Sequence, residues 1–261
     1  MSAITGDDYL TFCEGIRKLS GVDLTQYKRP QMERRLRSFL ERKGFRKLVD
    51  SLPQLRENQA ELDALLDRMT INVSQLWRNP QHWELLEQKV LPELGKTGRV
   101  NAWSAGSSYG AEAYTLGAIC REVIPKATVR ILGTDIDKRM VQRATIGEFS
   151  FEDARSAPAT EMQRWFDRTA TGWRAKPELR SIMKFEIGDL LRIRPQRSHF
   201  DLILCRNTVI YFSEPIRDEL HQRLATALRP GGYLMVGATE RVADPKSLDL
   251  VSAHPFIFRK T

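Results

Sequence analysis

The sequence predicts a doubly wound α/β domain with a parallel sheet, preceded by a small domain built only of helices. Three observations predict it. Apolar residues recur at helical spacing up to about Asp67, two glycines within residues 95–98 interrupt the pattern, and strand-like segments then alternate with helical ones. Such alternation is typical of a parallel sheet covered by helices on both faces. The length of 261 residues fits one large domain or two unequal ones.

Residues 1–75 are expected to form the helical domain. Strand-like alternation is absent there, and the apolar residues follow a helical period. The residues that define this period are Tyr9, Phe12, Ile16, Leu48, Leu52, Leu55, Leu62, Leu65 and Leu66. A linker at 76–95, helical from Trp83 to Leu94, is expected to lead into the α/β domain at 96–261.

The α/β domain is predicted from segments that follow one another in order. The expected strands are 100–103, 129–133, 200–205 and 233–237, with a turn at 229–232, and the expected helices are 111–121, 138–144 and 214–228. Residues 146–186 break the alternation. We expect a small antiparallel β-subdomain inserted there, with a helix at 161–166 and strands near 172–174 and 182–185.

Composition narrows the class of protein. The three cysteines, Cys13, Cys120 and Cys205, are too far apart for a disulfide framework or a CxxC metal site, so no metal is expected. No apolar run reaches the length of a membrane span, and acidic residues near the start do not fit a secretory leader. The sequence therefore predicts a cytoplasmic protein without membrane insertion.

The positive charge is concentrated in one segment. Residues 28–47 hold nine basic and two acidic residues, which accounts for +7 of the net charge of +8. Met32, Leu36, Phe39 and Leu40 share one helical face, and the opposite face carries Arg34, Arg35, Arg37 and Arg42. Such a basic amphipathic helix predicts an acidic partner, while a plain solvated surface is the simpler alternative.

The residues just after each predicted strand are the candidates for ligand binding, because a doubly wound sheet binds ligands at these ends. Small residues follow the first strand at 104–110, and Gly106 lets the backbone approach a ligand or make a tight turn. Asp135 ends the second strand, where a carboxylate can accept both hydroxyls of a ribose or can cap a helix.

Polar residues also follow the later strands. Asp189 is placed to bond the edge of an adenine or to close a turn, and Arg206 and Asn207 emerge from an apolar strand. The glycine-rich pyrophosphate loop of nicotinamide enzymes and the GxxxxGK[ST] loop of nucleotide hydrolases are both absent. A nucleoside without phosphates remains as the ligand, which describes S-adenosylmethionine.

Four ordered segments resemble the CheR family of chemotaxis receptor methyltransferases: 70–78 (TINVSQLWR), 103–108 (WSAGSS), 133–137 (GTDID) and 205–212 (CRNTVIYF). The resemblance is collinear from about Gly21 to Arg259. It implies a protein-glutamate O-methyltransferase that uses S-adenosylmethionine, leaves S-adenosylhomocysteine, and modifies the acidic cytoplasmic helices of chemotaxis receptors for sensory adaptation.

The resemblance also implies roles for single residues. The positions expected to bind the cofactor are Asn72, Ser74, Arg78, Glu112, Asp135, Asp189, Leu190, Arg206 and Asn207, with Gly106 from the loop. Arg78 and Tyr211 would also lie beside the transferred methyl group. The chain has SYGAEAY at 108–114 where the family usually has STGEEPY, and Asp189 replaces an Asn. Glu112 is retained, so a competent site is expected, with Tyr109 as the residue that could narrow it.

Two other functions stay open from the sequence. One is a methyltransferase that acts on RNA or another acidic acceptor through the basic helix, which predicts a steep dependence on salt. The other is a module that binds cofactor or receptor without catalysis. Receptor helices, and no nucleic acid, are the expected partner.

Overall fold

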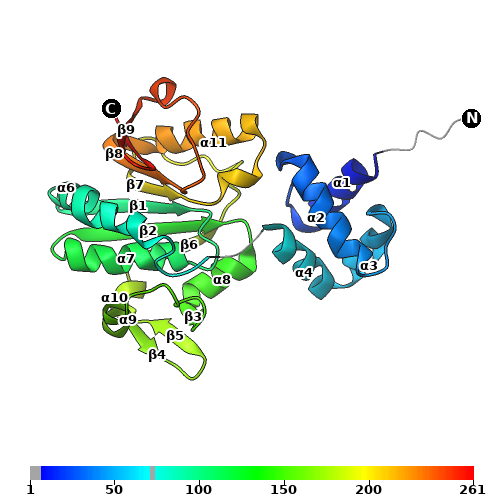
Figure 1. Ribbon diagram of the computed structural model, residues 1–261, viewed down its shortest axis with the longest axis horizontal. Coiled ribbons are helices and arrows are strands. Elements are labelled where there is room, and N and C mark those ends of the chain that lie inside the picture. Colours follow the sequence, from blue (N-terminus) through cyan, green and yellow to red (C-terminus); the bar gives the residue numbers. More distant parts are fainter. Residues whose placement is uncertain (1–6, 71–73) are drawn as a thin grey trace, which may run out of the picture. The chain divides into compact units, whose positions relative to one another are not determined.

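Two units make up the chain in the computed structural model, which describes residues 7–70 and 74–261 (Figure 1). The helical unit comprises Met1–Asn72 with Tyr211–Ile216, and the sheet unit comprises Val73–Ile210 with Arg217–Thr261. Among the described residues, no helix is long and apolar enough to cross a membrane.

Residues 7–70 of the helical unit form the helices α1 (Asp8–Ser20), α2 (Arg29–Glu41), α3 (Leu52–Glu57) and α4 (Gln59–Thr70), with short turns η1 (Leu24–Gln26) and η2 (Val49–Ser51). The carboxylate of Asp7 accepts a hydrogen bond from the Tyr9 backbone N–H at 3.1 Å and so caps α1. Gly21, with φ of +78°, ends α1. The predicted apolar faces are buried, including Phe12 of α1 and Leu36 of α2.

A short piece of later sequence completes the helical unit. Phe212 forms a β-bridge with Tyr27, and the two rings pack with centroids 5.2 Å apart. Lys28 donates its backbone N–H to the carbonyl oxygen of Tyr211 at 2.9 Å, and Ser213 donates to that of Gln26 at 3.1 Å. The chain thus leaves the sheet unit after Ile210 to pair with the helical unit.

The main sheet has seven strands in the order β6-β2-β1-β7-β8-β10-β9. Its parallel strands are β1 (Arg99–Ala105), β2 (Thr128–Asp135), β6 (Met183–Ile187), β7 (Phe200–Cys205) and β8 (Leu228–Val236). An antiparallel hairpin, β9 (Leu250–His254) and β10 (Ile257–Lys260), completes one edge. Every residue of β7 is buried, as the apolar run at 202–205 predicts for a central strand, and Asp201 near its start is buried as well.

Helices connect the parallel strands as expected. They are α7 (Ala111–Val123), α8 (Lys138–Ile146) and α11 (Glu214–Ala227). The helical stretch before β1 consists of α5 (Pro80–Leu85), the π-helical turn η3 (Leu86–Val90) and α6 (Leu91–Gly95). Pro92 stands in the first turn of α6, and because proline has no N–H to donate, the helical hydrogen-bond pattern changes just before it.

The small antiparallel sheet lies where the alternation breaks, and the strand predicted near 172–174 is present in it as its central strand. It consists of β3 (Glu148–Ser150), β5 (Gly172–Ala175) and β4 (Phe166–Arg168) in that order, with α9 (Ala159–Trp165) and α10 (Pro177–Arg180) beside it in sequence. The prediction of a subdomain strand at 182–185 is wrong. Those residues begin β6, which pairs in parallel with β2, for example Met183 with Ile131. An edge strand is half-buried, so it shows the same alternation as a hairpin strand.

The turn predicted at 229–232 lies inside β8 as a bulge. Leu228 pairs with Phe200 and Tyr233 pairs with Leu202, so the four residues between them face a single residue of β7. Gly231 there has φ of +79°, a backbone conformation that favours glycine. The β9–β10 hairpin was not predicted, because its polar residues and Pro255 hide any apolar period.

Candidate active site

The carboxyl ends of β1, β2, β6 and β7 bring the predicted ligand-binding residues to one edge of the sheet. Ala105 pairs with Thr134, and Asp135 pairs with Ile187. Gly106, Asp135 and Arg206 therefore lie at adjacent strand ends, as the rule for doubly wound sheets predicts.

The cofactor loop, residues 104–110, is held tightly to the end of β2. The backbone N–H groups of Gly106 and Ser107 each donate to the carbonyl oxygen of Thr134 at 2.9 Å. The N–H of Ser108 donates to Oδ2 of Asp135 at 2.7 Å. Gly106 has φ of +81°, and a Cβ there would lie 2.6 Å from Oγ1 of Thr208, so only glycine fits.

Polar groups at this loop fit a nucleoside with free hydroxyls. The hydroxyls of Ser107 and Ser108 are buried and have no hydrogen-bond partner within the described part of the chain. The Asp135 carboxylate accepts from Ser108 and from the N–H of Asp137 at 2.9 Å, yet a carboxylate offers about four acceptor positions. Burial raises the pKa of Asp135. Because buried polar groups normally find partners, these residues suit the ribose of S-adenosylmethionine.

A buried charge pair lies beside the loop. Nη1 of Arg206 is 3.5 Å from Oε2 of Glu112, and the two side chains are 2% and 12% exposed. Ser104 donates its hydroxyl to Oε1 of Glu112 at 2.8 Å. Burial raises the pKa of Glu112, and the charge of Arg206 opposes that rise. The pair keeps a carboxylate at the end of β1, where the amino group of a methionine moiety would find an acceptor.

Arg206 also holds the chain that precedes β1. Its Nη2 donates to the carbonyl oxygen of Arg78 at 2.9 Å, and its guanidinium lies 5.0 Å from the centre of the Trp83 ring. Nη2 is also 3.5 Å from Nδ1 of His82, whose pKa is lowered by burial and by the charge of Arg206. The predicted residues Arg78, Glu112 and Arg206 are thus brought together.

Glu240 was missed from the sequence and organises the loop after β7. It is 3% exposed, and burial raises its pKa. Its Oε2 accepts from the N–H groups of Gly237 (2.7 Å) and Asn207 (2.8 Å), and its Oε1 from those of Val209 (2.9 Å) and Ile210 (3.3 Å). Asn207 is held with φ of +58°. Glu240 follows the end of β8, so the rule that identified Asp135 could have found it.

The other predicted residues are placed as follows. Oδ1 of Asp189 accepts from the N–H of Leu191 at 2.9 Å, which is the turn alternative, and its role at an adenine stays a prediction. Leu190 is buried. Ser74 accepts a hydrogen bond at its carbonyl oxygen from Tyr109. Tyr211 belongs to the helical unit, and Asn72 lies outside the described residues.

The four arginines predicted to bind a partner, three in α2 and Arg42 just after it, have different surroundings. Arg37 pairs with Glu33 at 2.6 Å and with Asp8 at 3.3 Å. Arg35 donates to the carbonyl oxygens of Arg68 (2.8 Å) and Met69 (3.4 Å) at the end of α4. The remaining two, Arg34 and Arg42, are exposed. In residues 7–70 and 74–261, no cluster of three or more His, Cys, Asp or Glu side chains could hold a metal ion.

Comparisons with known proteins show the family to which the chain belongs. Residues 72–257 match the family described as CheR methyltransferase, SAM binding domain, and residues 7–70 match CheR methyltransferase, all-alpha domain. The chain is 33% identical to a chemotaxis protein methyltransferase of Listeria innocua, and the aligned region covers 97% of each chain. It is 32% identical to chemotaxis protein methyltransferase 1 of Pseudomonas aeruginosa, and here the aligned region covers 98% of each chain. The chain therefore belongs to the CheR methyltransferase family and uses S-adenosylmethionine as its methyl donor.

Proposed function

We propose that this methyltransferase esterifies glutamate side chains on the cytoplasmic helices of chemotaxis receptors, and that it acts in the cytoplasm. The observation that carries the proposal is the match of both domains to one family whose relatives are named chemotaxis protein methyltransferases. The exposed basic residues of the helical unit supply a surface of the sign that acidic receptor helices require.

The reaction requires that the acceptor carboxylate be oriented toward the methyl group and that water be excluded from it. A glutamate carboxylate has a pKa of about 4.3 in water, so it is ionised at neutral pH and needs no general base. S-adenosylmethionine supplies an electrophilic methyl group on a sulfonium. Asp135 would hold the ribose hydroxyls, Glu112 the methionine amino group, and Asp189 with Leu190 the adenine. Arg78 would orient the acceptor carboxylate through charge-assisted hydrogen bonds.

A transfer assay tests this function. The protein is incubated with S-adenosylmethionine labelled in the methyl group and with a receptor cytoplasmic fragment, and Asp135→Asn serves as the inactive control. We expect label in the fragment that alkali releases as methanol. Label that resists alkali would contradict ester formation. Label in RNA, with an affinity that falls steeply with salt, would favour the RNA alternative.

Tyr211→Phe is expected to lower kcat by about tenfold, because the lost hydroxyl hydrogen bond is worth about 1.4 kcal/mol in the transition state. The Kd for S-adenosylhomocysteine should stay within about twofold. Tyr233→Phe is the matched control, since its hydroxyl bonds to Glu93 at 2.8 Å, near the amino end of β1. Full turnover in Tyr211→Phe with cofactor bound would remove Tyr211 from the mechanism.

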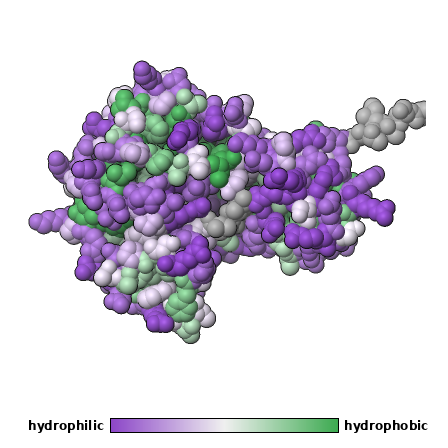
Figure 2. Space-filling view, in the orientation of Figure 1, coloured by the Kyte–Doolittle hydropathy of each residue, from purple (hydrophilic) through white to green (hydrophobic). Residues whose placement is uncertain are grey.

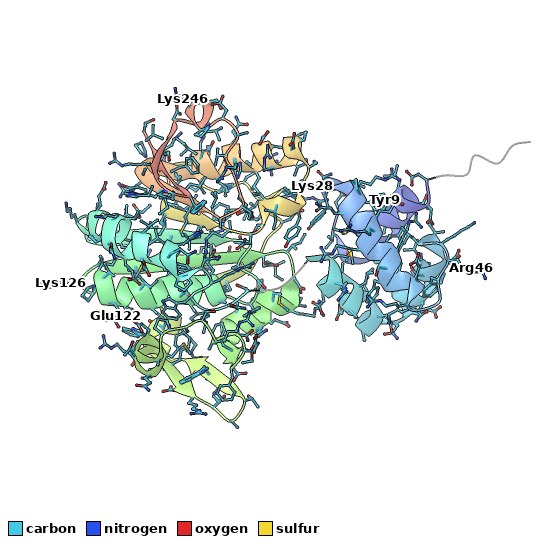
Figure 3. All side chains as sticks on the ribbon, viewed as in Figure 1. Tyr9, Lys28, Arg46, Glu122, Lys126 and Lys246 are labelled. Carbon is cyan, nitrogen blue, oxygen red and sulfur yellow. The ribbon has the colours of Figure 1, made fainter. Side chains whose placement is uncertain are left out.

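We further propose that residues 1–75 select the receptor, that 76–95 link, and that 96–261, with an insert near 146–186, transfer the methyl group. Hydrophilic side chains dominate the visible face of the helical unit (Figure 2), and Arg46 projects from it into solvent (Figure 3). Because Arg37 is neutralised by its acidic neighbours, Arg34 and Arg42 are the members of the predicted set that we expect to contact receptor most strongly.

Reversing the charge of Arg34 and Arg42 to Glu is expected to lower kcat/KM for receptor by about tenfold at low salt, because favourable steering becomes repulsion. The deficit should shrink at high salt, where charges are screened beyond a few ångströms. The affinity for S-adenosylhomocysteine should not change. The control reverses Lys96 and Lys126, which are exposed on the sheet unit. Equal losses in both variants would contradict a receptor-specific surface.

A further inference from the structure

One side-chain network in the sheet unit joins the cofactor loop to the segment that precedes α5. Tyr109 lies in the loop and is 2% exposed. Its hydroxyl hydrogen-bonds to the carbonyl oxygen of Ser74 and lies 2.9 Å from Oδ1 of Asp153. A residue whose bulk suggested a narrowed site therefore reaches from the loop to Ser74, four residues before Arg78.

Asp153 is the centre of this network. Its carboxylate pairs with the guanidinium of Arg143 and accepts from the N–H of Ser150 at 2.8 Å. Its own carbonyl oxygen accepts from the N–H of Leu76 at 2.9 Å. Asp153 thus holds the segment 74–76 directly through its backbone and indirectly through Tyr109.

Arg143 closes the network from α8. Its guanidinium carbon is 3.9 Å from the centre of the Tyr109 ring, while its Nη2 pairs with Asp153. A cation over an aromatic face is attractive, so Arg143 fixes the ring and the carboxylate together. Burial and the charge of Asp153 raise the pKa of Tyr109, so its hydroxyl remains a donor at neutral pH.

We propose that Tyr109 is a positioning residue for the methyl donor, and that Tyr109, Asp153 and Arg143 act as a latch that holds the segment 74–78 against the cofactor loop. Without the hydroxyl, the segment keeps its bonds to the backbone of Asp153, to Thr115 and to Arg206, but Ser74 loses its direct bond to the loop. Cofactor binding would then lose affinity by the free energy that is needed to order the backbone around Ser74. The inference rests on the proposed role of Ser74 and Arg78 at the cofactor, and it does not depend on the identity of the methyl acceptor.

Tyr109→Phe removes the hydroxyl and keeps the ring. We expect the Kd for S-adenosylhomocysteine, measured by calorimetry, to rise about tenfold, which corresponds to about 1.4 kcal/mol. The KM for S-adenosylmethionine should rise equally, while kcat at saturating donor stays within about twofold. Tyr114→Phe is the matched control. Tyr114 is also buried and packs on the same Phe149 as Tyr109. Its hydroxyl donates to the carbonyl oxygen of Ala144 at 3.0 Å, and Tyr114→Phe removes that hydrogen bond. Its Kd should stay within about twofold of the wild type.

Asp153→Asn tests whether the residues act as one unit. In that background we expect Tyr109→Phe to raise the Kd by less than about threefold, because the Asp153–Arg143 pair that fixes the Tyr109 ring is already lost and the hydroxyl no longer holds Ser74 in place. An unchanged Kd in Tyr109→Phe, or an equal rise in Tyr114→Phe, would overturn the latch. Asp135→Asn separates this result from failure of the site itself. If Asp135→Asn weakens binding while Tyr109→Phe does not, the result supports the proposed cofactor site and contradicts the latch. If neither variant weakens binding, the result contradicts both.

Discussion

Replacing Glu112 by glutamine is expected to lower the free energy of unfolding of the sheet unit by about 3–5 kcal/mol, because Arg206 would keep its charge in a buried place without its paired carboxylate, with the weaker attraction of Glu240 remaining. The Arg206 side chain is 2% exposed, and its Nε has no hydrogen-bond partner among the described residues. Urea denaturation followed by tryptophan fluorescence measures this loss. All tryptophans report on the sheet unit, since they are Trp77, Trp83, Trp103, Trp165 and Trp173.

Two further variants isolate the cause of this loss. Glu122→Gln changes a carboxylate at the surface of the same helix, where Glu122 pairs with Arg164, and should cost less than about 1 kcal/mol. The double variant Glu112→Gln with Arg206→Met removes the buried charge itself. It should be more stable than Glu112→Gln alone, because an apolar side chain needs no counter-charge. A loss below about 1 kcal/mol in Glu112→Gln would show that water reaches Arg206.

The sheet and its functional edge could be predicted because both follow from short patterns. The apolar run at 202–205 predicted a buried central strand. The residues that follow it and those that follow 129–133 lie at the same edge of the sheet, because parallel strands have their carboxyl ends on one side. The strand at 182–185 was assigned to the wrong sheet because alternation reports half-burial and not the identity of the neighbour. The neighbouring strand is β2, whose Ile131 lies some fifty residues earlier in the sequence.

The roles of individual polar residues depend on partners far along the chain. The pattern of α2 predicted its buried face, and Met32, Leu36 and Leu40 confirm it. It did not predict that Arg35 would bond to carbonyl oxygens at the end of α4 or that Arg37 would pair with Asp8. Charge patterning alone therefore overestimates the number of arginines available to a partner.

Glu240→Gln is the second variant with a large expected effect. Each oxygen of the carboxylate accepts two backbone N–H groups, from Gly237 and Asn207 on one side and from Val209 and Ile210 on the other. In a glutamine one oxygen becomes an NH₂ group, which is itself a donor, so two N–H groups lose their acceptor. Each buried unsatisfied group costs roughly 1–3 kcal/mol, so we expect a loss of about 2–6 kcal/mol in the free energy of unfolding.

Cofactor affinity should reveal the effect of Glu240→Gln on the loop after β7 independently of its effect on stability. Glu240 accepts the backbone N–H of Asn207, which has φ of +58°, a left-handed conformation that is uncommon for a non-glycine residue although asparagine adopts it more readily than most. Under conditions where Glu240→Gln is folded, the Kd for S-adenosylhomocysteine should therefore rise by about tenfold or more. Glu93→Gln is the control, because Glu93 accepts from Tyr233 and Arg259 near the opposite end of β8. It should leave the Kd unchanged. If Glu240→Gln lost stability but kept the wild-type Kd, Glu240 would support the fold alone, and the placement of Asn207 at the cofactor would have to be abandoned.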